Sequence, residues 1–228
     1  RERVKEKFGI HVTADNNEVV EKADVVLLSV KPQFYADVIS GIKDKIRPDQ
    51  IVITIAPGKT LSWLAEQFGK DVKIVRCMPN TPAMVGEGMS GVSYDEALFT
   101  DEEKDVIDGF FTSFGKMEKV DEKLMDVVGS ASGCSPAYVY MFIEALADGC
   151  VKNGLPRQAA YKMVAQAVLG SAKMVLETGK HPGELKDMVC SPGGTTIEGL
   201  AALEENGFRG AIIKACDANF EKNKKLTV

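Results

Sequence analysis

The spacing of apolar residues changes near residue 121, and this change limits the possible folds more than any other feature of the sequence. Before it, short β-branched apolar runs at 24–30, 50–55 and 72–77 alternate with stretches of helical periodicity, and 88–94 and 116–120 are predicted to be later strands. After it, the apolar residues recur only at helical spacing. The sequence therefore predicts a sheet-containing domain over 1–121 and an all-helical domain over 122–228.

The first half has the order of a parallel sheet with crossover helices. Helical stretches at 34–46 and 61–68 separate the apolar runs, and Thr60 is a suitable N-cap for the second of them. The segment Thr100-Asp-Glu-Glu103 has the pattern of a capping box that opens a further helix. Strands separated by helices of this length predict βαβ units, and so the class α/β for this half and all-α for the other.

The second half opens with a helix that is apolar on nearly every face. Ser135 is predicted to be its N-cap and Pro136 its first helical residue. A helix that is hydrophobic all round must be covered by other protein. It is predicted to be either the centre of the helical domain or part of a subunit interface. Its apolar positions include Val139, Met141, Phe142, Ile143, Leu146 and Cys150.

Charge and cysteine usage exclude several classes of function. The 228 residues carry a formal net charge of -5, which does not attract nucleic acid or an anionic membrane. The five cysteines are scattered, and with the two distant histidines they form no zinc-ligand spacing. No stretch of about twenty apolar residues occurs in the sequence. We expect a cytoplasmic protein without a metal, a nucleic-acid partner or a membrane span.

Unusual tails follow three successive predicted strands. They are Ser29-Val-Lys-Pro32, Ala56-Pro-Gly58 and Met78-Pro-Asn-Thr-Pro82. Proline and glycine occur in ordinary loops, so a single tail says little. Three tails that leave the same edge of a parallel sheet would instead line one ligand site, because ligands bind beyond the carboxyl ends of such strands. Together the tails favour a cofactor site.

A literal G-x-G-x-x-G at Gly86–Gly91 does not have the context of a dinucleotide fingerprint. That motif must follow a strand and open a helix, whereas this one follows Pro82 and leads into a strand-like run. Glu87 would also place a carboxylate against phosphate. The segment is predicted to be a turn before a strand.

The segment Cys190-Ser-Pro-Gly-Gly-Thr-Thr-Ile-Glu198 permits two interpretations. Thr195 with Glu198 has the pattern of a capping box, so the segment would be only a well-capped helix start. Alternatively, the paired glycines leave backbone N–H groups open to a carboxylate, and the helix dipole assists. The residues alone favour neither.

No arrangement typical of a hydrolase is present. The segment Gly129-Ser-Ala-Ser-Gly133 nearly matches a nucleophile elbow, but its central residue is Ala131. His11, predicted at the start of a strand, and His181, predicted to break a helix, have no catalytic partner in the sequence and are interpreted as structural.

Several segments together resemble the pyrroline-5-carboxylate reductase family along nearly the whole chain. The segment Ser191–Ile197 is the most specific of them. The others, in order, are Ser29–Pro32, Arg76–Pro82, Ser132–Tyr138, Ala145–Gly149, and His181–Gly183 with Leu185–Asp187. The resemblance implies a partial Rossmann-type sheet that uses NADPH or NADH, followed by a helical domain that forms a homodimer or a higher homo-oligomer with clefts built from both subunits. The implied reaction reduces 1-pyrroline-5-carboxylate to L-proline.

The resemblance also assigns residues to roles. Thr196 is implied as the catalytic residue, whose hydroxyl hydrogen-bonds the ring nitrogen of the imine. The implied substrate-binding positions are Glu122, Ser191, Gly193, Gly194, Thr195 and Thr196. The implied cofactor-binding positions are Asn16, Ser29, Val30, Lys31, Pro32, Ile55, Ala56, Pro57, Met78, Pro79, Asn80 and Thr81.

Two departures from the family pattern accompany this resemblance. Cys134 and Ser135 stand where many relatives have serine and glycine. Family members also begin with a strand, a glycine-rich turn, a helix and a second strand, whereas Arg1 is expected to lie inside the following helix. Roughly one βαβ unit is then missing, and weak cofactor binding is expected. The alternatives are a cofactor-deficient fragment that acts only as a helical dimer module, and a related imine or hydroxyacid reductase.

Overall fold

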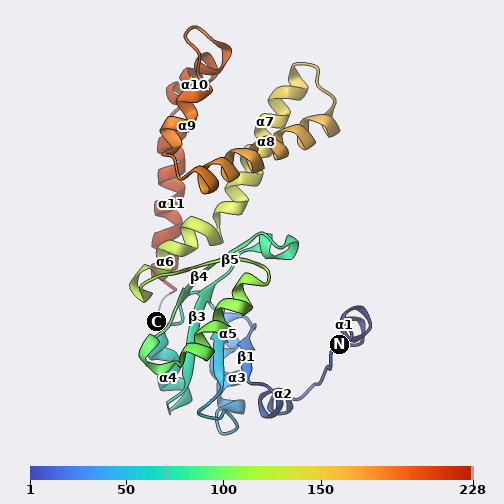
Figure 1. The fold of residues 1–228 in the computed structure, drawn as a ribbon, viewed down its shortest axis with the longest axis vertical. Helices are drawn as coiled ribbons and strands as arrows, with labels where there is room; N and C mark the ends of the chain where they lie inside the picture. Colours follow the sequence, from blue (N-terminus) through green and yellow to red (C-terminus); the bar gives the residue numbers. More distant parts are fainter. Residues whose placement is uncertain (70, 227–228) are drawn as a thin grey trace. The chain divides into compact units, whose positions relative to one another are not determined.

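The computed structural model describes residues 1–69 and 71–226 (Figure 1). The chain forms two compact units. The sheet unit contains Arg1–Cys134 and the described tail from Asn219, and the helical unit contains Ser135–Ala218. These limits differ from the predicted domains 1–121 and 122–228. Residues 122–134 belong to the sheet unit because Glu122 is hydrogen-bonded to Arg76 of β3. The tail belongs to it because Asn219 and Asn223 are hydrogen-bonded to Ser130 and Asp126.

The sheet unit contains one five-stranded sheet among the described residues, in the order β1-β2-β3-β4-β5. Its strands are β1 (Val25–Leu28), β2 (Ile51–Thr54), β3 (Lys73–Met78), β4 (Gly88–Ser93) and β5 (Gly115–Lys119). All five correspond to predicted runs. The neighbouring strands β1, β2 and β3 are parallel, as predicted.

The sheet is not parallel throughout. β4 pairs antiparallel with β3, and β5 runs parallel to β4. The physical reason is the connection between β3 and β4, which holds only the 3₁₀ helix Thr81–Val85. A parallel return requires a crossover of a dozen or more residues, so this short connection reverses the chain.

Two helices of the sheet unit, α4 and α5, begin at the predicted caps. Thr60 accepts a hydrogen bond from the Trp63 amide, and Thr100 with Glu103 forms the capping box. His11 is not in a strand; it lies before α2, with its Nε2 3.0 Å from Glu18 Oε1. The α-helices are α1 (Glu2–Phe8), α2 (Asn16–Lys22), α3 (Tyr35–Ile42), α4 (Leu61–Phe68), α5 (Asp101–Thr112) and α6 (Met125–Val128), with 3₁₀ helices at Pro32–Phe34, Glu96–Leu98 and Glu122–Leu124 and a π-helix at Gly129–Gly133.

Both faces of the central strands are buried. Alternate residues of each strand enter two different clusters, since successive side chains point to opposite faces. Val52 and Ile74 pack with α2, α3 and α4, whereas Ile51, Ile53 and Val75 pack with α5. This double coverage explains why the strands read as continuous apolar runs in the sequence.

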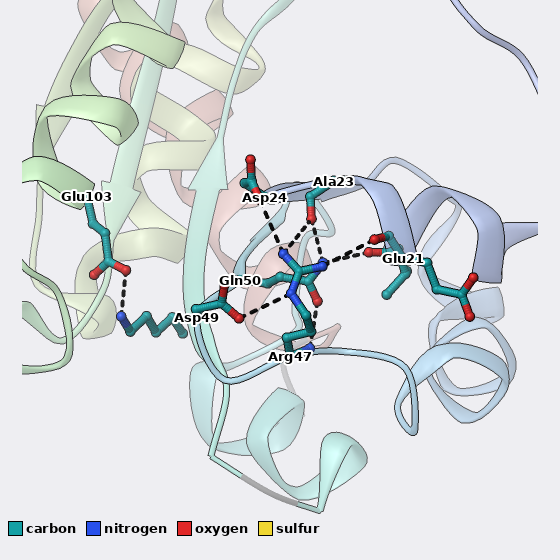
Figure 2. A network of polar contacts seen from close by, with 9 residues as sticks. Glu21, Ala23, Asp24, Arg47, Asp49, Gln50 and Glu103 are labelled. Atoms are coloured by element: carbon teal, nitrogen blue, oxygen red, sulfur yellow. Dashed lines mark hydrogen bonds and ion pairs between the residues drawn. The ribbon is translucent and has the colours of Figure 1, made fainter.

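A polar network holds the amino ends of β1 and β2 together (Figure 2). The fully buried Gln50 side chain donates to the carbonyls of Val20 and Ala23, at 2.6 and 2.5 Å, and accepts from the Arg47 amide at 2.6 Å. The Arg47 guanidinium donates to the Ala23 carbonyl at 3.5 Å and to the Asp24 carboxylate at 3.2 Å. The network therefore joins the end of α2 to the start of β2.

The Lys73–Glu103 ion pair should make stability depend on pH. Their charged atoms are 2.6 Å apart, and the hydrogen bond from Lys73 holds the pKa of Glu103 below its usual value of 4.5. A lowered folded-state pKa adds stability above the unfolded pKa, and this is lost as pH falls through the folded value. Glu103→Gln keeps the capping geometry, so we expect a loss of up to about 1 kcal/mol at pH 7 that shrinks below pH 4.5.

Urea unfolding of the wild type and Glu103→Gln between pH 7 and pH 3 measures this effect. Lys73→Met should reduce the same pH dependence, because it removes the partner cation. An equal stability difference between wild type and Glu103→Gln at both ends of the range would show that the ion pair is not its cause.

The helical unit contains four complete helices and most of a fifth among its described residues. Ser135 is the first residue of α7 and not its N-cap, because the π-helix runs almost directly into α7. Of the apolar side chains of α7, only Ala147 is buried, whereas Met141 is 72% exposed. No helix within 1–69 and 71–226 is long and apolar enough to cross a membrane. The helices are α7 (Ser135–Lys152), α8 (Arg157–Thr178), α9 (Pro182–Met188), α10 (Thr195–Glu205) and α11 (Phe208–Lys224).

Candidate functional site

The predicted strand tails leave the same edge of the sheet. Leu28 of β1 pairs with Thr54 of β2, which pairs with Arg76 of β3, so the tails begin at nearly the same level. The first tail presents exposed polar and charged groups at Ser29 and Lys31. Of the other predicted cofactor positions at this edge, Val30 and Thr81 are exposed and Ala56 is buried. The rest are half-buried: Pro32, Ile55, Pro57, Met78, Pro79 and Asn80.

A buried hydroxyl pair fixes the ends of β1 and β2 beneath these tails. Tyr35 of α3 donates to the Leu28 carbonyl at 2.5 Å and accepts from the Thr54 hydroxyl at 3.0 Å. Burial raises the pKa of Tyr35 above its ordinary value, so the phenol stays protonated and can donate. Cys77 also lies here, and burial raises the pKa of its thiol to about 12. This cysteine is therefore a structural residue and not a nucleophile.

Asn80 connects the third tail to two other elements. Its side-chain oxygen accepts from the Met89 amide at 2.9 Å, and its side-chain nitrogen donates to the Ser132 carbonyl at 3.1 Å. Gly133 lies close to Met78, since a Cβ added there would be 3.5 Å from Met78 Cγ. The segment Met78–Thr81 is thus held between β4 and the π-helix.

The G-x-G-x-x-G segment is a turn before a strand, as predicted. Gly86 has φ 78° at the end of the 3₁₀ helix Thr81–Val85, and β4 begins at Gly88. A Cβ at Gly88 would approach the Phe114 carbonyl to 2.8 Å. These glycines therefore serve the turn and the close packing of β4, and the segment opens no helix that could hold phosphate.

Asn16 lies at the first position of α2 and is exposed. It lines a pocket of about 350 Å³ between α2 and α3, together with Asp15, Asn17 and Asp37. Carboxylates and amides suit hydroxyl groups better than phosphates, because a carboxylate repels an anion and accepts an O–H.

Glu122 is bound to the sheet through one carboxylate oxygen. Its Oε1 accepts from the Leu61 amide at 2.6 Å and from Arg76 at 3.1 Å. The Arg76 side chain is only 3% exposed, and Asp126 lies 3.7 Å from its second nitrogen. Glu122 thus caps the start of α4 and neutralises a buried cation. Its role as a substrate residue stays a prediction.

The paired glycines of the helical unit form a tight turn. The Gly194 amide donates to the Ser191 carbonyl at 3.0 Å, and Gly193 has φ 67°. A Cβ at Gly194 would lie 2.4 Å from the Ser191 hydroxyl and 3.1 Å from the Ser191 carbonyl oxygen, so a larger residue would crowd the turn. Ser191, Gly193, Thr195 and Thr196 are exposed.

The predicted capping box at Thr195 is wrong. Gly194 is the N-cap of α10, it makes no side-chain cap, and Thr195 is already helical. The first backbone N–H groups of α10 are therefore left without an intrahelical acceptor or a capping side chain. This geometry favours the second interpretation, in which the helix tip accepts a carboxylate.

Two elements of the site were missed from the sequence. The segment Gly129–Gly133 forms a π-helix, which is typical of functional regions but has no simple sequence signature. The buried Arg76 could have been noticed as a cation near the carboxyl end of the apolar run 72–77. No group of three or more His, Cys, Asp or Glu side chains that could hold a metal occurs in the described part of the chain.

Comparison with known proteins agrees with this architecture. The family model described as pyrroline-5-carboxylate reductase dimerisation matches residues 122–226, and the model described as NADP oxidoreductase coenzyme F420-dependent matches residues 1–58. Fold and family models together define an oxidoreductase with a Rossmann-type sheet and a helical dimerisation region.

Individual relatives identify the family. The chain is 50% identical to a pyrroline-5-carboxylate reductase of Escherichia coli (97% of this chain, 82% of the relative) and 46% identical to one of Glycine max (97% and 80%). A Coxiella burnetii pyrroline-5-carboxylate reductase is similar in structure, with TM-score 0.90 and 34% identity over 100% of this chain and 84% of that one. An NADP-bound Plasmodium falciparum pyrroline carboxylate reductase has TM-score 0.87 and 36% identity (95% and 82%). The chain belongs to the pyrroline-5-carboxylate reductase family.

Proposed function

We propose that this protein reduces 1-pyrroline-5-carboxylate to L-proline with NAD(P)H, the last step of proline biosynthesis. The observation that carries the proposal is the Ser191–Gly194 turn, which presents uncapped N–H groups at the tip of α10 directly before Thr196. Such a tip suits a substrate that carries a carboxylate. Curated relatives named pyrroline-5-carboxylate reductase, 50% and 46% identical to this chain, support the same reaction.

The sheet edge fits a dinucleotide cofactor. Three strand tails emerge together there, with a cation at Lys31, hydroxyl groups at Ser29 and Thr81, and the fixed amide of Asn80. A bound NAD(P)H would supply the hydride that reduces the C=N bond. We assign the nicotinamide half to Met78–Thr81, because this segment is held rigidly by Asn80, and the other cofactor contacts to the first two tails and Asn16.

The residues of the helical unit act on the substrate. The N–H groups in the first turn of α10, which follow the paired glycines, hold the carboxylate, and the Thr196 hydroxyl hydrogen-bonds the ring nitrogen. A protonated imine is already electrophilic, so positioning can suffice without a strong protein acid.

The dimerisation region supports a homo-oligomer, and we propose that the unit of assembly is a dimer. Large apolar side chains of α7 and α8 are exposed in the single chain, and they include Met141, Leu146, Met163 and Leu169. A second copy of the helical region would cover such a surface. The five free cysteines support a reducing compartment, and we propose the cytoplasm.

An assay of proline formation tests the proposed function. The protein is incubated with 1-pyrroline-5-carboxylate and either NADPH or NADH, and proline is quantified alongside loss of nicotinamide absorbance. A keto acid serves as the comparison substrate, because a hydroxyacid reductase would prefer it. We expect proline to form and the keto acid to react at least about a hundredfold more slowly. Equal or faster reduction of the keto acid would contradict the assignment.

A further inference from the structure

The π-helix Gly129–Gly133 is held from one side by two asparagines of the C-terminal tail. The buried Ser130 hydroxyl donates to Asn219 Oδ1 at 2.7 Å. Asn219 Nδ2 lies 2.9 Å from Cys134 Sγ, just after the π-helix. Asn223 donates to the Asp126 carbonyl at 3.2 Å and to Asn219 Oδ1 at 3.2 Å. The two asparagines are 85 to 97 positions away in the sequence from Ser130, Cys134 and Asp126.

The backbone of the π-helix is shaped for this contact. A Cβ at Gly129 would lie 2.4 Å from Asn223 Nδ2, so only glycine allows the asparagine to approach. Cys134 is the last residue of the sheet unit before the chain leaves it, and Asn219 is the first after it returns. The residue at which the chain leaves the sheet unit and the residue at which it returns are therefore in direct side-chain contact.

The same π-helix also holds the predicted nicotinamide segment. The Ser132 carbonyl accepts from Asn80 Nδ2, and Asn80 Oδ1 in turn accepts from the Met89 amide. A continuous chain of contacts thus runs from Asn219 through Ser130 and Ser132 to Asn80. π-Helices are rare and frequently lie at functional sites, so contacts that hold this one in place bear on the site.

We propose that Asn219 is a positioning residue for the reaction: through the π-helix it sets the place of Asn80 and so of the segment that receives the nicotinamide. This proposal rests on the proposed function. Asn219 itself need not touch substrate or cofactor. A displacement of about 1 Å at a reacting group can cost roughly a hundredfold in rate, so a remote residue that fixes the π-helix can control turnover.

Amide hydrogen exchange tests the structural link without any assay of activity. The Met89 N–H is bonded to Asn80 Oδ1, so it reports whether Asn80 stays in place. In Asn219→Ala we expect Met89 to exchange at least about tenfold faster. Lys222→Ala, an exposed residue of the same helix, is the control and should leave exchange unchanged. Unchanged exchange in Asn219→Ala, or an equal increase in Lys222→Ala, overturns the proposal.

Kinetics test whether the link matters for the reaction. We expect Asn219→Ala to raise the KM for NADPH and lower kcat, each by roughly tenfold, with the KM for the imine little changed. Because Asn219 acts through Asn80, the double variant Asn219→Ala/Asn80→Ala should be no worse than Asn80→Ala alone. Losses that multiply in the double variant, or kinetics of Asn219→Ala equal to the wild type, overturn the proposal.

Ser130→Ala keeps the test decisive if Asn219→Ala does not fold. It removes only the hydroxyl that donates to Asn219, and alanine is compatible with a helical backbone. Like Asn219→Ala, it should speed up Met89 exchange and raise the KM for NADPH. If Ser130→Ala shows neither change, the link is rejected. If the wild type makes no proline while Met89 responds as expected, the proposed function fails and the mechanical link stands.

Discussion

Replacement of Thr196 by alanine should lower kcat for imine reduction by about a hundredfold, with a smaller change in the KM for the imine. Thr196 is exposed in the first turn of α10, where the backbone N–H groups have no capping side chain. A donor that hydrogen-bonds the reacting group mainly in the transition state contributes to kcat more than to binding. Steady-state kinetics with 1-pyrroline-5-carboxylate and saturating NADPH measure the effect.

Thr196→Ser is the matched variant, because it keeps the hydroxyl and removes only a methyl group. It should recover most of the activity that Thr196→Ala loses. Thermal unfolding of both variants should be close to that of the wild type, since the side chain is exposed. Wild-type turnover in Thr196→Ala would remove this residue from the mechanism.

Replacement of Gln50 by alanine should destabilise the sheet unit by about 3 kcal/mol, the largest effect on stability that we expect from a single polar side chain here. Gln50 is fully buried, and its amide satisfies the Val20 and Ala23 carbonyls and the Arg47 N–H (Figure 2). Alanine would leave these groups without their bonds to the side chain and create a small cavity. Urea unfolding monitored by circular dichroism gives the free energy of unfolding.

Gln33→Ala is the control for Gln50→Ala, because Gln33 is exposed in the 3₁₀ helix Pro32–Phe34. It should change the free energy of unfolding by no more than about 0.5 kcal/mol. A similarly small change in Gln50→Ala would mean that water replaces the lost bonds. The network joins the amino ends of β1 and β2, far along the strands from the proposed cofactor edge. We therefore expect Gln50→Ala to lower the free energy of unfolding by more than it lowers the free energy of cofactor binding.

These predictions separate two kinds of polar residue in the sheet unit. Gln50 and Arg47 act at the amino end of β2, where they join α2 to the sheet. Asn80 acts beyond the carboxyl end of β3, where its two hydrogen bonds fix the third strand tail. Ligands of open α/β sheets bind at the carboxyl edge, so only the second kind is expected to alter the KM for NADPH directly.

Much of the fold was predictable because its causes are local in the sequence. The strands β2 and β3 follow from short runs rich in β-branched residues that are buried on both faces, and the caps at Thr60 and Thr100 follow from side chains that bond amides three residues on. The tails after β1, β2 and β3 could be placed at one edge because parallel strands end together.

The errors have local causes of a different kind. Thr195 has the right pattern for an N-cap, but the Ser191–Gly194 turn continues directly into α10 and makes Gly194 the cap. Ser135 fits an N-cap equally well, yet the chain arrives there already coiled, from the π-helix. In both cases the conformation of the preceding residues determined where the helix begins, and the pattern of an N-cap does not encode that conformation.

By itself the sequence determined the change from sheet to helices, the strand tails and the glycine turn before Thr196, because each depends on residues close together along the chain. Only the tertiary structure decided that Glu122 bonds to Arg76 and the Leu61 amide, and that Asn219 bonds to the π-helix. Those features depend on partners 46 to 89 residues apart in the sequence. A hydrogen bond between such distant side chains leaves no periodic pattern in the sequence, so it becomes visible only when the chain is folded.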